Sequence, residues 1–478
     1  MSKIEVNTVE PQCGTTLTLG ASGDTVTLGS GASQSGFGRT GTVDWQTTAK
    51  TSDFTAVNGE GYFVDTNSGA VTATLPASPS AGDIVSFKDY QGTFGSNALT
   101  LNRNSSKING TTDNAVVSTT STFLTLIYVD GTQGWVALDD DTTTIGDTFI
   151  VATGGTITTC GNFKTHTFTG PGTFTVSCLA TSPANNAVEY VVVAGGGGGG
   201  GSDNSGSSAR ESGGGGAGGF RSYTSLTNSS PKNAPQGLTV TATAFPITVG
   251  AGGAGSIGGG CDPTRQGCSG SNSVFSTITS AGGGGGGSGF DNCGPARNGG
   301  PGGNGGGGGA DPSSGGGTAG SGNTPSVSPP QGEDGGTGGH VPGNWAAGGG
   351  GGGAGAAGTA AANPGTPGIG QGGNGGVGSF VPSGFGTPSP LRFPGPISGA
   401  HYFSGGGGGG SMFSSPTEGV GGSGGGGAGG SGPPGAARAP GSGTANSGGG
   451  GGGQGRSAPS NTSGSGGSGI VMIRYKFQ

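Results

Sequence analysis

The chain has 478 residues, of which 28% are apolar, 9% are charged and 125 are glycine, and its formal net charge is −7. So little apolar material excludes one large globule and favours several small β modules in series. The first 194 residues carry a net charge of −9 and the rest carry +2, so neither part has the basic surface that nucleic-acid binding needs. No apolar run approaches the roughly 20 residues of a membrane span, so we expect no membrane insertion.

The amino-terminal segment, residues 1–41, contains a short internal repeat. Within Thr16–Ala32, TLTLGASGD is followed by TVTLGSGA, and leucine or valine alternates with threonine in both copies. Two strands this short cannot bury a face alone, and in an elongated shaft their neighbours are other copies of the chain. We therefore expect an attachment segment with a short β-repeat shaft and, by this packing need and by analogy, a homotrimer. Residues 1–10 lack the basic and apolar pattern of a secretory signal.

Residues 42–141 predict a compact β module. Turn signals such as Asn58-Gly59 and Asp130-Gly131 separate short alternating segments. Seven strands at this spacing indicate a sandwich or a jelly-roll-like unit. The expected strands are 54–57, 62–64, 70–75, 84–88, 99–101, 123–129 and 135–138.

Residues 142–186 are predicted to form a connector. A polar break at Asp139–Thr144 precedes it, and the sequence THTFTGPGTFTVSC, Thr165–Cys178, reads as a β-hairpin. Gly170-Pro171-Gly172 supplies its turn.

The remaining residues, 187–478, are rich in glycine, and 102 of the 125 glycines lie after residue 194. A flexible linker and an ordered bundle of polyglycine II helices both fit such runs. We favour the bundle, since the runs recur at intervals, carry little charge and alternate with segments rich in aromatics and proline. Glycine has no Cβ, so neighbouring rods can approach closely enough to bond backbone to backbone. The longest runs are 195–201, 213–219, 282–287, 348–353, 405–410 and 448–453.

Strand-like segments anchor the ends of these runs. Val188–Ala194 (VEYVVVA) enters the first run, and Ile470–Phe477 (IVMIRYKF) closes the sequence. Leu238–Val249 and Ser273–Ala281 also lead directly into glycine. We expect these four segments to form one small sheet that clamps the rods.

The six cysteines do not form a metal-binding pattern, because no CxxC motif and no nearby histidine accompany them. Cys261 and Cys268 flank a loop, and Cys293 is an alternative partner for a disulfide that would tie down this region. The opposing interpretation is that all stay reduced as small buried groups.

Long stretches of the chain resemble known proteins. They are IEVNTVEPQCGTTLTLGASGDTVTLGSGA at the start, the module containing FTAVNGEGYFVDTNSGAVTATLPASPSAGDIVSFKDY and YVDGTQGW, and ATGGTITTCGNFKTHTFTGPGTFTV followed by EYVVVAGGGGGGG. These sequences resemble tail fibre proteins of marine bacteriophages, especially those that infect cyanobacteria. The remaining residues are similar in style to the glycine-rich adhesins that cap the long fibres of some contractile-tailed phages. The resemblance implies a trimeric virion appendage that contacts the host surface, although no long amino-terminal anchoring domain is recognised here.

Motifs for catalysis are weak, and we expect no enzyme activity and no cofactor. Polyglycine matches G-x-G-x-x-G by chance, and no G-x-x-x-x-G-K-[ST] occurs. Asp139–Asp141 reads more readily as a solvated turn than as a metal site. A glycan-cleaving tailspike needs two carboxylates across a groove, and residues 195–478 contain only eight acidic residues.

Receptor binding needs rigid aromatic anchors and adaptable polar neighbours on loops held by a stiff frame. Segments 323–347 and 379–404 offer such residues. The alternative is that these rings cover the glycine rods as the only apolar layer of the domain. The candidates are Trp345, His340, Asn344, Phe385, Arg392, Phe393, His401 and Tyr402.

The sequence therefore predicts an all-β, elongated and modular phage tail fibre that is made in the host cytoplasm, released by lysis and located in the virion as a tail appendage. Its expected partners are two further copies of the chain, other virion tail proteins through the amino terminus, and a host surface glycan or protein. A purely structural fibre or sheath component is the alternative, and an ice- or surface-binding protein is a third possibility.

Overall fold

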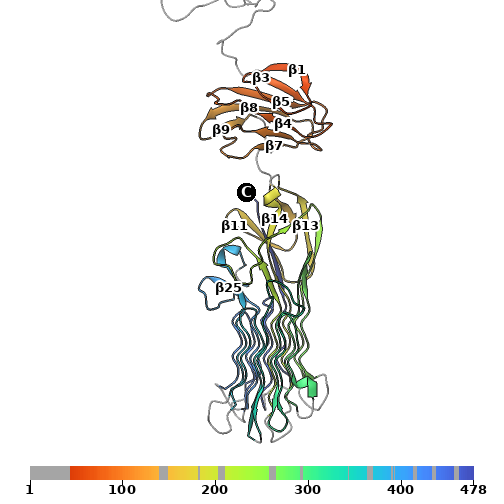
Figure 1. Cartoon of the computed structure of the whole chain (residues 1–478), viewed down its shortest axis with the longest axis vertical. Coiled ribbons are helices and arrows are strands. Elements are labelled where there is room, and N and C mark those ends of the chain that lie inside the picture. Colours follow the sequence, from red (N-terminus) through yellow and green to blue (C-terminus); the bar gives the residue numbers. More distant parts are fainter. Residues whose placement is uncertain are drawn as a thin grey trace, which may run out of the picture. The chain divides into compact units, whose positions relative to one another are not determined.

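The computed structural model describes residues 43–138, 149–180, 183–202, 210–257, 265–290, 294–342, 344–362, 370–388, 391, 393–412, 417–432, 438–456 and 462–477. They belong to two compact units, within residues 1–146 and 147–478 (Figure 1). The described residues are nearly all in strands and extended segments, which confirms the expected all-β class. The predicted shaft, residues 1–41, and Asp139–Asp141 lie outside the described residues.

The first unit is a sandwich of two sheets in the orders β1-β3-β5-β8-β9 and β2-β4-β6-β7. Strands β1 to β6 alternate between the sheets, so neighbours such as β1 and β3, or β4 and β6, run parallel. Alternating apolar residues from both sheets, including Tyr62, Ala73 and Leu101, fill one core. The strands are β1 (Asp44–Lys50), β2 (Phe54–Thr55), β3 (Glu60–Val64), β4 (Val71–Thr74), β5 (Ile84–Asp89), β6 (Leu99–Asn102), β7 (Ala115–Val117), β8 (Phe123–Asp130) and β9 (Gly134–Ala137).

All seven strands expected in this unit are present, within a few residues of their predicted bounds. The sequence reading missed β1 and β7. Strand β1, DWQTTAK, has no regular apolar alternation, and β7 has only three residues.

The second unit contains two larger sheets, in the orders β10-β13-β17-β18-β19 and β11-β12-β26-β14-β15, with β16 paired to β14. Residues such as Phe174, Tyr190 and Ile473 pack between them. The strands are β10 (Val151–Thr153), β11 (Thr156–Cys160), β12 (Phe163–Phe168), β13 (Gly172–Cys178), β14 (Ala187–Val193), β15 (Phe220–Tyr223), β16 (Leu238–Thr239), β17 (Ala244–Thr248), β18 (Ser273–Phe275), β19 (Ile278–Ser280) and β26 (Ile470–Lys476), and the 3-10 turn η1 spans Pro183–Asn186.

Two expectations about this unit are wrong. Strands β12 and β13 do not form a hairpin with each other, because β12 pairs with β11 and β26 whereas β13 pairs with β10 and β17. The turn at 170–172 passes the chain from one sheet to the other, which lets Phe168 and Phe174 share one core. The expected connector is therefore part of the glycine-rich unit, and the four predicted clamp segments are divided between both sheets.

Glycine-rich segments run side by side from these sheets (Figure 1). The first, 194–202, has a three-residue repeat in its hydrogen bonds, so that every third N–H donates to the same neighbouring segment. Its acceptor residues also recur every three positions. The N–H groups of Ala194, Gly197 and Gly200 donate to the carbonyls of residues 219, 216 and 213. Those of Gly195, Gly198 and Gly201 donate to the carbonyls of residues 271, 268 and 265. Those of Gly196 and Gly199 donate to the carbonyls of residues 467 and 464.

The carbonyls of the same segment accept from three further segments. Gly195 and Gly198 accept from 283 and 286, Gly196 and Gly199 accept from 253 and 256, and Gly197 and Gly200 accept from 451 and 454. Six neighbours therefore surround one segment, and all of its residues are buried. A Cβ on Gly197 would lie 2.2 Å from the Gly284 carbonyl oxygen, so this interior admits no side chain there.

Candidate functional site

The predicted receptor-binding residues fall into two groups at different places. His340, Asn344 and Trp345 share the hairpin of β22 (Gly339–Val341) and β23 (Trp345–Ala347). Phe385, Phe393, His401 and Tyr402 belong to the region of β24 (Ser379–Pro382), η4 (Ser383–Phe385) and β25 (Ala400–Phe403), and Arg392 lies outside the described residues. Ala347 bridges to Ser411, and residues 404–410 separate Ser411 from β25. The seven residues of this segment therefore separate the two groups along the chain.

The β22–β23 hairpin packs its tryptophan inward. Trp345 is only 3% exposed, and a Cβ on Gly370 would lie 2.3 Å from its ring. His340 and Asn344 are exposed. Of this group, only the two polar side chains are therefore available to a ligand, while the ring covers glycine backbone. Beside the hairpin lie β20 (Ala310–Asp311) and β21 (Gly315–Gly316). Arg297, at the end of the 3-10 turn η3 (Gly294–Arg297), donates to the Ser314 and Gly315 carbonyls.

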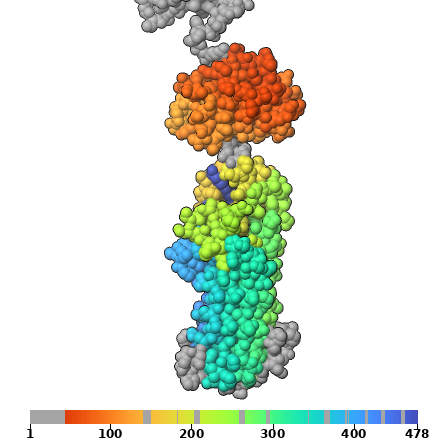
Figure 2. Space-filling view, in the orientation of Figure 1, coloured from red at the N-terminus to blue at the C-terminus, as the bar shows by residue number. Residues whose placement is uncertain are grey.

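The described residues between β24 and β25, namely 383–388, 391 and 393–399, belong to a loop that we call the lateral loop. It stands out from the side of the glycine-rich segments (blue in Figure 2). Two threonines of the neighbouring sheet hold its first turn: Thr165 Oγ1 donates to the Phe385 carbonyl (2.9 Å), and Thr158 Oγ1 donates to the Gly386 carbonyl (3.0 Å). Phe385 itself is fully buried, in a core that includes Phe403 and Met472.

Tyr402 supports the second half of the lateral loop. The Ile397 N–H donates to the Tyr402 hydroxyl (3.2 Å), and the Tyr402 N–H donates to the Phe393 carbonyl (2.9 Å). A Cβ on Gly395 would lie 2.1 Å from the tyrosine ring, so glycine is required for this close approach. Tyr402 is 3% exposed, which makes it a support for the loop and not a surface contact.

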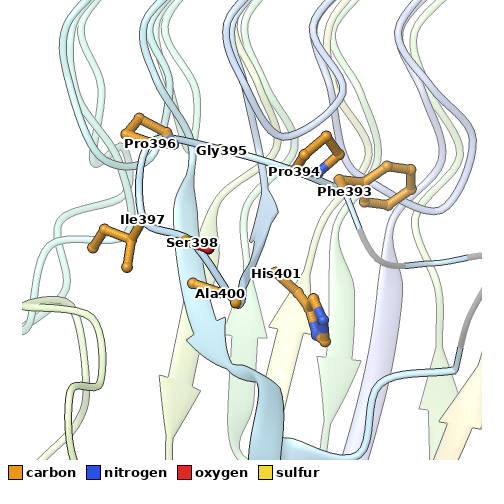
Figure 3. A pocket seen from close by; sticks show the side chains of 9 residues that line it. Phe393, Pro394, Gly395, Pro396, Ile397, Ser398, Ala400 and His401 are labelled. Carbon is orange, nitrogen blue, oxygen red and sulfur yellow. The ribbon is translucent and has the colours of Figure 1, made fainter.

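The lateral loop lines an open cavity of about 430 Å³ (Figure 3). The rings of Phe393 and His401 lie to one side of it, and Ile397 lies to the other. Two further cavities adjoin the loop, of about 400 and 230 Å³. Phe393 lines the first two, and residues 397–400 line the first and the third. Threonine and asparagine side chains supply polar groups to the outer cavities, namely Thr156, Thr167, Thr169, Thr227, Asn228, Thr444 and Asn446.

Several charged and titratable groups of this unit are buried, among them Glu189, Arg474 and His166. The Arg474 guanidinium lies over the Phe163 ring (3.6 Å) and pairs with Glu189 (2.5 Å). His166 contacts the Gly154 carbonyl through Nδ1 (2.7 Å) and the Tyr475 hydroxyl through Nε2 (3.0 Å), and burial lowers its pKa from 6.5. Among the described residues, no three His, Cys, Asp or Glu side chains are grouped so as to hold a metal ion. The described part of the chain also contains no helix that is long and apolar enough to cross a membrane.

The disulfide prediction stays a prediction. Cys268 is a free, exposed cysteine in the structure, and its two suggested partners, Cys261 and Cys293, lie outside the described residues. Cys160 and Cys178 are also free and exposed.

Sequence reasoning missed the residues that shape the lateral loop cavity. Ile397 is 49% exposed and lines two cavities, and Ser398 lines both with it. The sequence FPGPISGA, 393–400, contains a signal for them, because two prolines and two glycines restrict and turn the backbone around a single aliphatic residue. The supporting threonines, Thr158 and Thr165, are more than 200 residues away, and no local pattern connects them to the loop.

The sequence matches a known protein family. The sequence profile of the Glycine-rich domain family matches residues 167–476, which is more than half of the chain. The matched region runs from the last two residues of β12 to the last residue of β26, so it contains the glycine-rich segments and strands β13 to β26. A search of curated proteins finds no match.

Proposed function

We propose that this chain, which belongs to the Glycine-rich domain family, is a bacteriophage tail fibre that adheres to the host cell surface through loops held on its glycine scaffold. The resemblance of residues 1–201 to marine phage fibres motivates the proposal. On this proposal the protein is a trimer, attaches to other virion tail proteins through its amino terminus, and contacts a host glycan or protein. It acts by binding and catalyses no reaction.

The glycine-rich segments are proposed to be polyglycine II helices. Their hydrogen-bond partners repeat every three residues, which is the number of residues per turn of that helix. Such a scaffold is stiff because an interior segment such as 194–202 is bonded to six neighbours. Stiffness matters for adhesion, because a loop that is already ordered loses less conformational entropy when it binds.

The lateral loop is the observation that carries the proposal. Its backbone is fixed by Thr158, Thr165 and Tyr402, while Ile397 stays exposed and lines two cavities. A purely structural component has no need for a braced loop with an open cavity, so this arrangement favours binding over that alternative. The exposed His340 and Asn344 offer a second, smaller set of contacts.

Competition for adsorption tests the proposal. The purified full chain should bind susceptible cells and reduce adsorption of the phage. Ile397→Asp should weaken this competition by about tenfold or more, because a charge replaces the apolar contact, and should leave thermal unfolding unchanged. Val420→Asp is the matched control, since Val420 is an aliphatic residue that is 64% exposed away from the lateral loop cavities.

The alternative, a purely structural component, predicts a different result in the same assays. A chain that folds normally but neither binds cells nor reduces adsorption is a structural component of the virion. Tyr402→Ala and Trp345→Ala distinguish support from contact, because both rings are buried. We expect each to lower the unfolding temperature in addition to any effect on adhesion.

A further inference from the structure

The first unit carries aromatic residues on the outer face of one sheet. Side chains alternate along a strand, so Tyr62 and Val64 of β3 enter the core and Phe63 points away from it. Trp45 of β1 lies beside Gly61, which is on the same outer face as Phe63. Phe123 of β8 is in one row with Phe63, with Lys88 of β5 between them.

The rings of these residues touch each other. The Trp45 ring centroid lies 5.0 Å from that of Phe63 and 5.9 Å from that of Phe123, with interplanar angles of 39° and 37°. The Phe63 centroid lies 6.2 Å from that of Tyr90. We call Trp45, Phe63, Tyr90 and Phe123 the aromatic platform. Glycine at position 61 permits it, because a Cβ there would lie 2.9 Å from the Trp45 ring.

The aromatic platform is open to solvent within the described unit. Phe123 is 43% exposed, Tyr90 is 55% exposed, and the other two rings are half-buried. The sandwich does not need them for its core, which has its own aromatic residues, Tyr62, Phe87 and Trp135, on the inner side. An exposed cluster of rings that the core does not use marks a binding surface.

Size and charge select the ligand. With about 150–250 Å² per aromatic side chain, these exposures leave about 300 Å² of ring surface. A stable protein interface needs about 800 Å² from each partner, so the aromatic platform suits a smaller molecule. Residues 43–138 contain eight acidic and four basic side chains, which disfavours a polyanion. Lys88 is the only charged side chain in the row, and its Nζ donates to the Ser121 carbonyl (2.5 Å).

We propose that the aromatic platform binds a neutral, extended glycan. A pyranose ring exposes C–H groups on its faces and hydroxyls at its edge, so the faces stack on Trp45 and Phe123 while the hydroxyls bond to the Tyr90 hydroxyl and the Lys88 ammonium. Phe63 and Phe123 lie in one row across β3, β5 and β8, and this line of contacts suits an extended ligand such as a β-1,4-linked chain. This site lies in the first unit and does not depend on the adhesive role of the lateral loop.

Titration calorimetry on the full chain tests the proposal. The probes are the β-1,4-linked hexasaccharides of glucose and of N-acetylglucosamine, with the helical α-1,4-linked glucose hexasaccharide as the shape control. We expect at least one β-1,4-linked probe to bind and the α-linked probe to bind at least tenfold more weakly. Phe123→Ala and Trp45→Ala should each weaken binding by tenfold or more.

A control variant and thermal unfolding distinguish a loss of binding from a loss of stability. Val57→Ala removes an apolar side chain that is 54% exposed in the same unit but outside the aromatic platform, and it should bind like the original chain. Thermal unfolding of Phe123→Ala should match that of Val57→Ala.

The proposal is overturned if no β-1,4-linked probe binds at millimolar concentration, or if Phe123→Ala binds as well as the original chain. It is also overturned if sedimentation shows that either ring variant dissociates an oligomer, because the aromatic platform is then a contact between copies of this chain. The adsorption assay with Ile397→Asp reports on the lateral loop alone, so the two proposals fail separately.

Discussion

The two units of this chain build their interiors from opposite materials. The first unit buries side chains, among them Trp135, Phe87 and Leu101, between two sheets. In the second unit, the segment 194–202 is equally buried, yet apart from its first and last residues it consists of glycine. Both interiors satisfy the requirement that buried N–H and C=O groups be paired. A strand in a sheet pairs with two neighbours, whereas the segment 194–202 pairs with six.

This difference changes what holds each interior together. Apolar burial contributes about 25 cal/mol per Å² and tolerates a change of shape, provided that volume is conserved. The glycine-rich interior has little apolar area to bury and depends on close contact between backbones. Its cost is entropic, because glycine loses more conformational freedom on folding than any other residue. The small sheets and the apolar cluster around Phe385 and Phe403 hold the ends of the segments in place.

Amide exchange is the strongest way to break the comparison. We expect the amides of residues 195–201 to exchange as slowly as those of β5, because each donates to a carbonyl inside the bundle. An opening free energy of about 5 kcal/mol slows exchange by about 10³-fold or more relative to free peptide. Exchange measured by mass spectrometry on the full chain, against a peptide of the same sequence, checks this. Exchange of these amides at the peptide rate would show that the second half is a tether with no scaffold.

Substitution by alanine sharpens the comparison. Gly197→Ala places a Cβ 2.2 Å from the Gly284 carbonyl oxygen, and no flexible side chain is there to yield. We expect a loss of more than about 4 kcal/mol, which belongs to the exceptional class of point mutations. Calorimetric unfolding of the full chain measures the effect.

The matched change in the first unit is Leu101→Met. Leu101 is fully buried, yet a volume-conserving apolar exchange should cost less than about 1.5 kcal/mol. Gly131→Ala is a second control, since a Cβ at this position meets nothing within 4 Å. Equal losses from Gly197→Ala and Leu101→Met would contradict the proposed difference between the two interiors.

The ion pair of Glu189 and Arg474 joins the two central strands of the larger sheet. Glu189 also accepts from Thr224 Oγ1 (2.9 Å) and Ser225 Oγ (2.6 Å). Glu189→Gln leaves the buried guanidinium without a charged partner, which should destabilise the second unit by about 3–5 kcal/mol. Glu333→Gln is the control, because Glu333 is 40% exposed in its pair with Lys232 and should cost about 1 kcal/mol or less. Similar unfolding temperatures for the two variants would argue against a role for the buried pair as a clamp.

Much of the fold could be predicted from local pattern. Alternating residues identified seven of the nine strands of the first unit, and VEYVVVA and IVMIRYKF marked β14 and β26. What failed was the assignment of partners. THTFTGPGTFTVSC has every local feature of a hairpin, yet its halves enter different sheets because Phe168 and Phe174 both face the core between them. Sequence pattern indicates that a strand forms, but burial of the whole unit decides where the strand pairs.

Only part of the candidate site could be predicted from the sequence. Aromatic residues drew attention to segment 379–404, where the lateral loop is found, but composition cannot tell a covering ring from an exposed one. Tyr402 and Phe385 proved to be buried supports, whereas the exposed Ile397 was overlooked as an ordinary aliphatic residue. Contacts with neighbours in space, such as Thr165, decide which ring is buried, and Thr165 lies 220 residues from Phe385 in sequence.

The smallest expected effect concerns a carboxyl group placed inside the glycine-rich interior. Glu211 is fully buried, and one of its oxygens accepts from the Arg456 N–H (2.9 Å). Burial raises the pKa of Glu211 well above 4.5, against the opposing effect of Arg456. The folded chain therefore keeps a proton that the unfolded chain releases above about pH 4.5, so this group makes the fold less stable as pH rises from that value towards the folded pKa. His166 acts in the other direction, because its lowered pKa removes stability as pH falls through 6.5.

Comparing variants isolates the contribution of Glu211, since both proteins keep His166. Glu211→Gln retains the acceptor for Arg456 and has no proton to lose, so it should be more stable than the original chain at pH 7.5 by about 1 kcal/mol. Well below pH 4.5, where the carboxyl is protonated in both states, the advantage should vanish. Unfolding temperatures of the two proteins across this range measure the difference. A constant difference at every pH would mean that packing of the amide, and not the cost of burying a charge, sets the stability at this point of the glycine-rich interior.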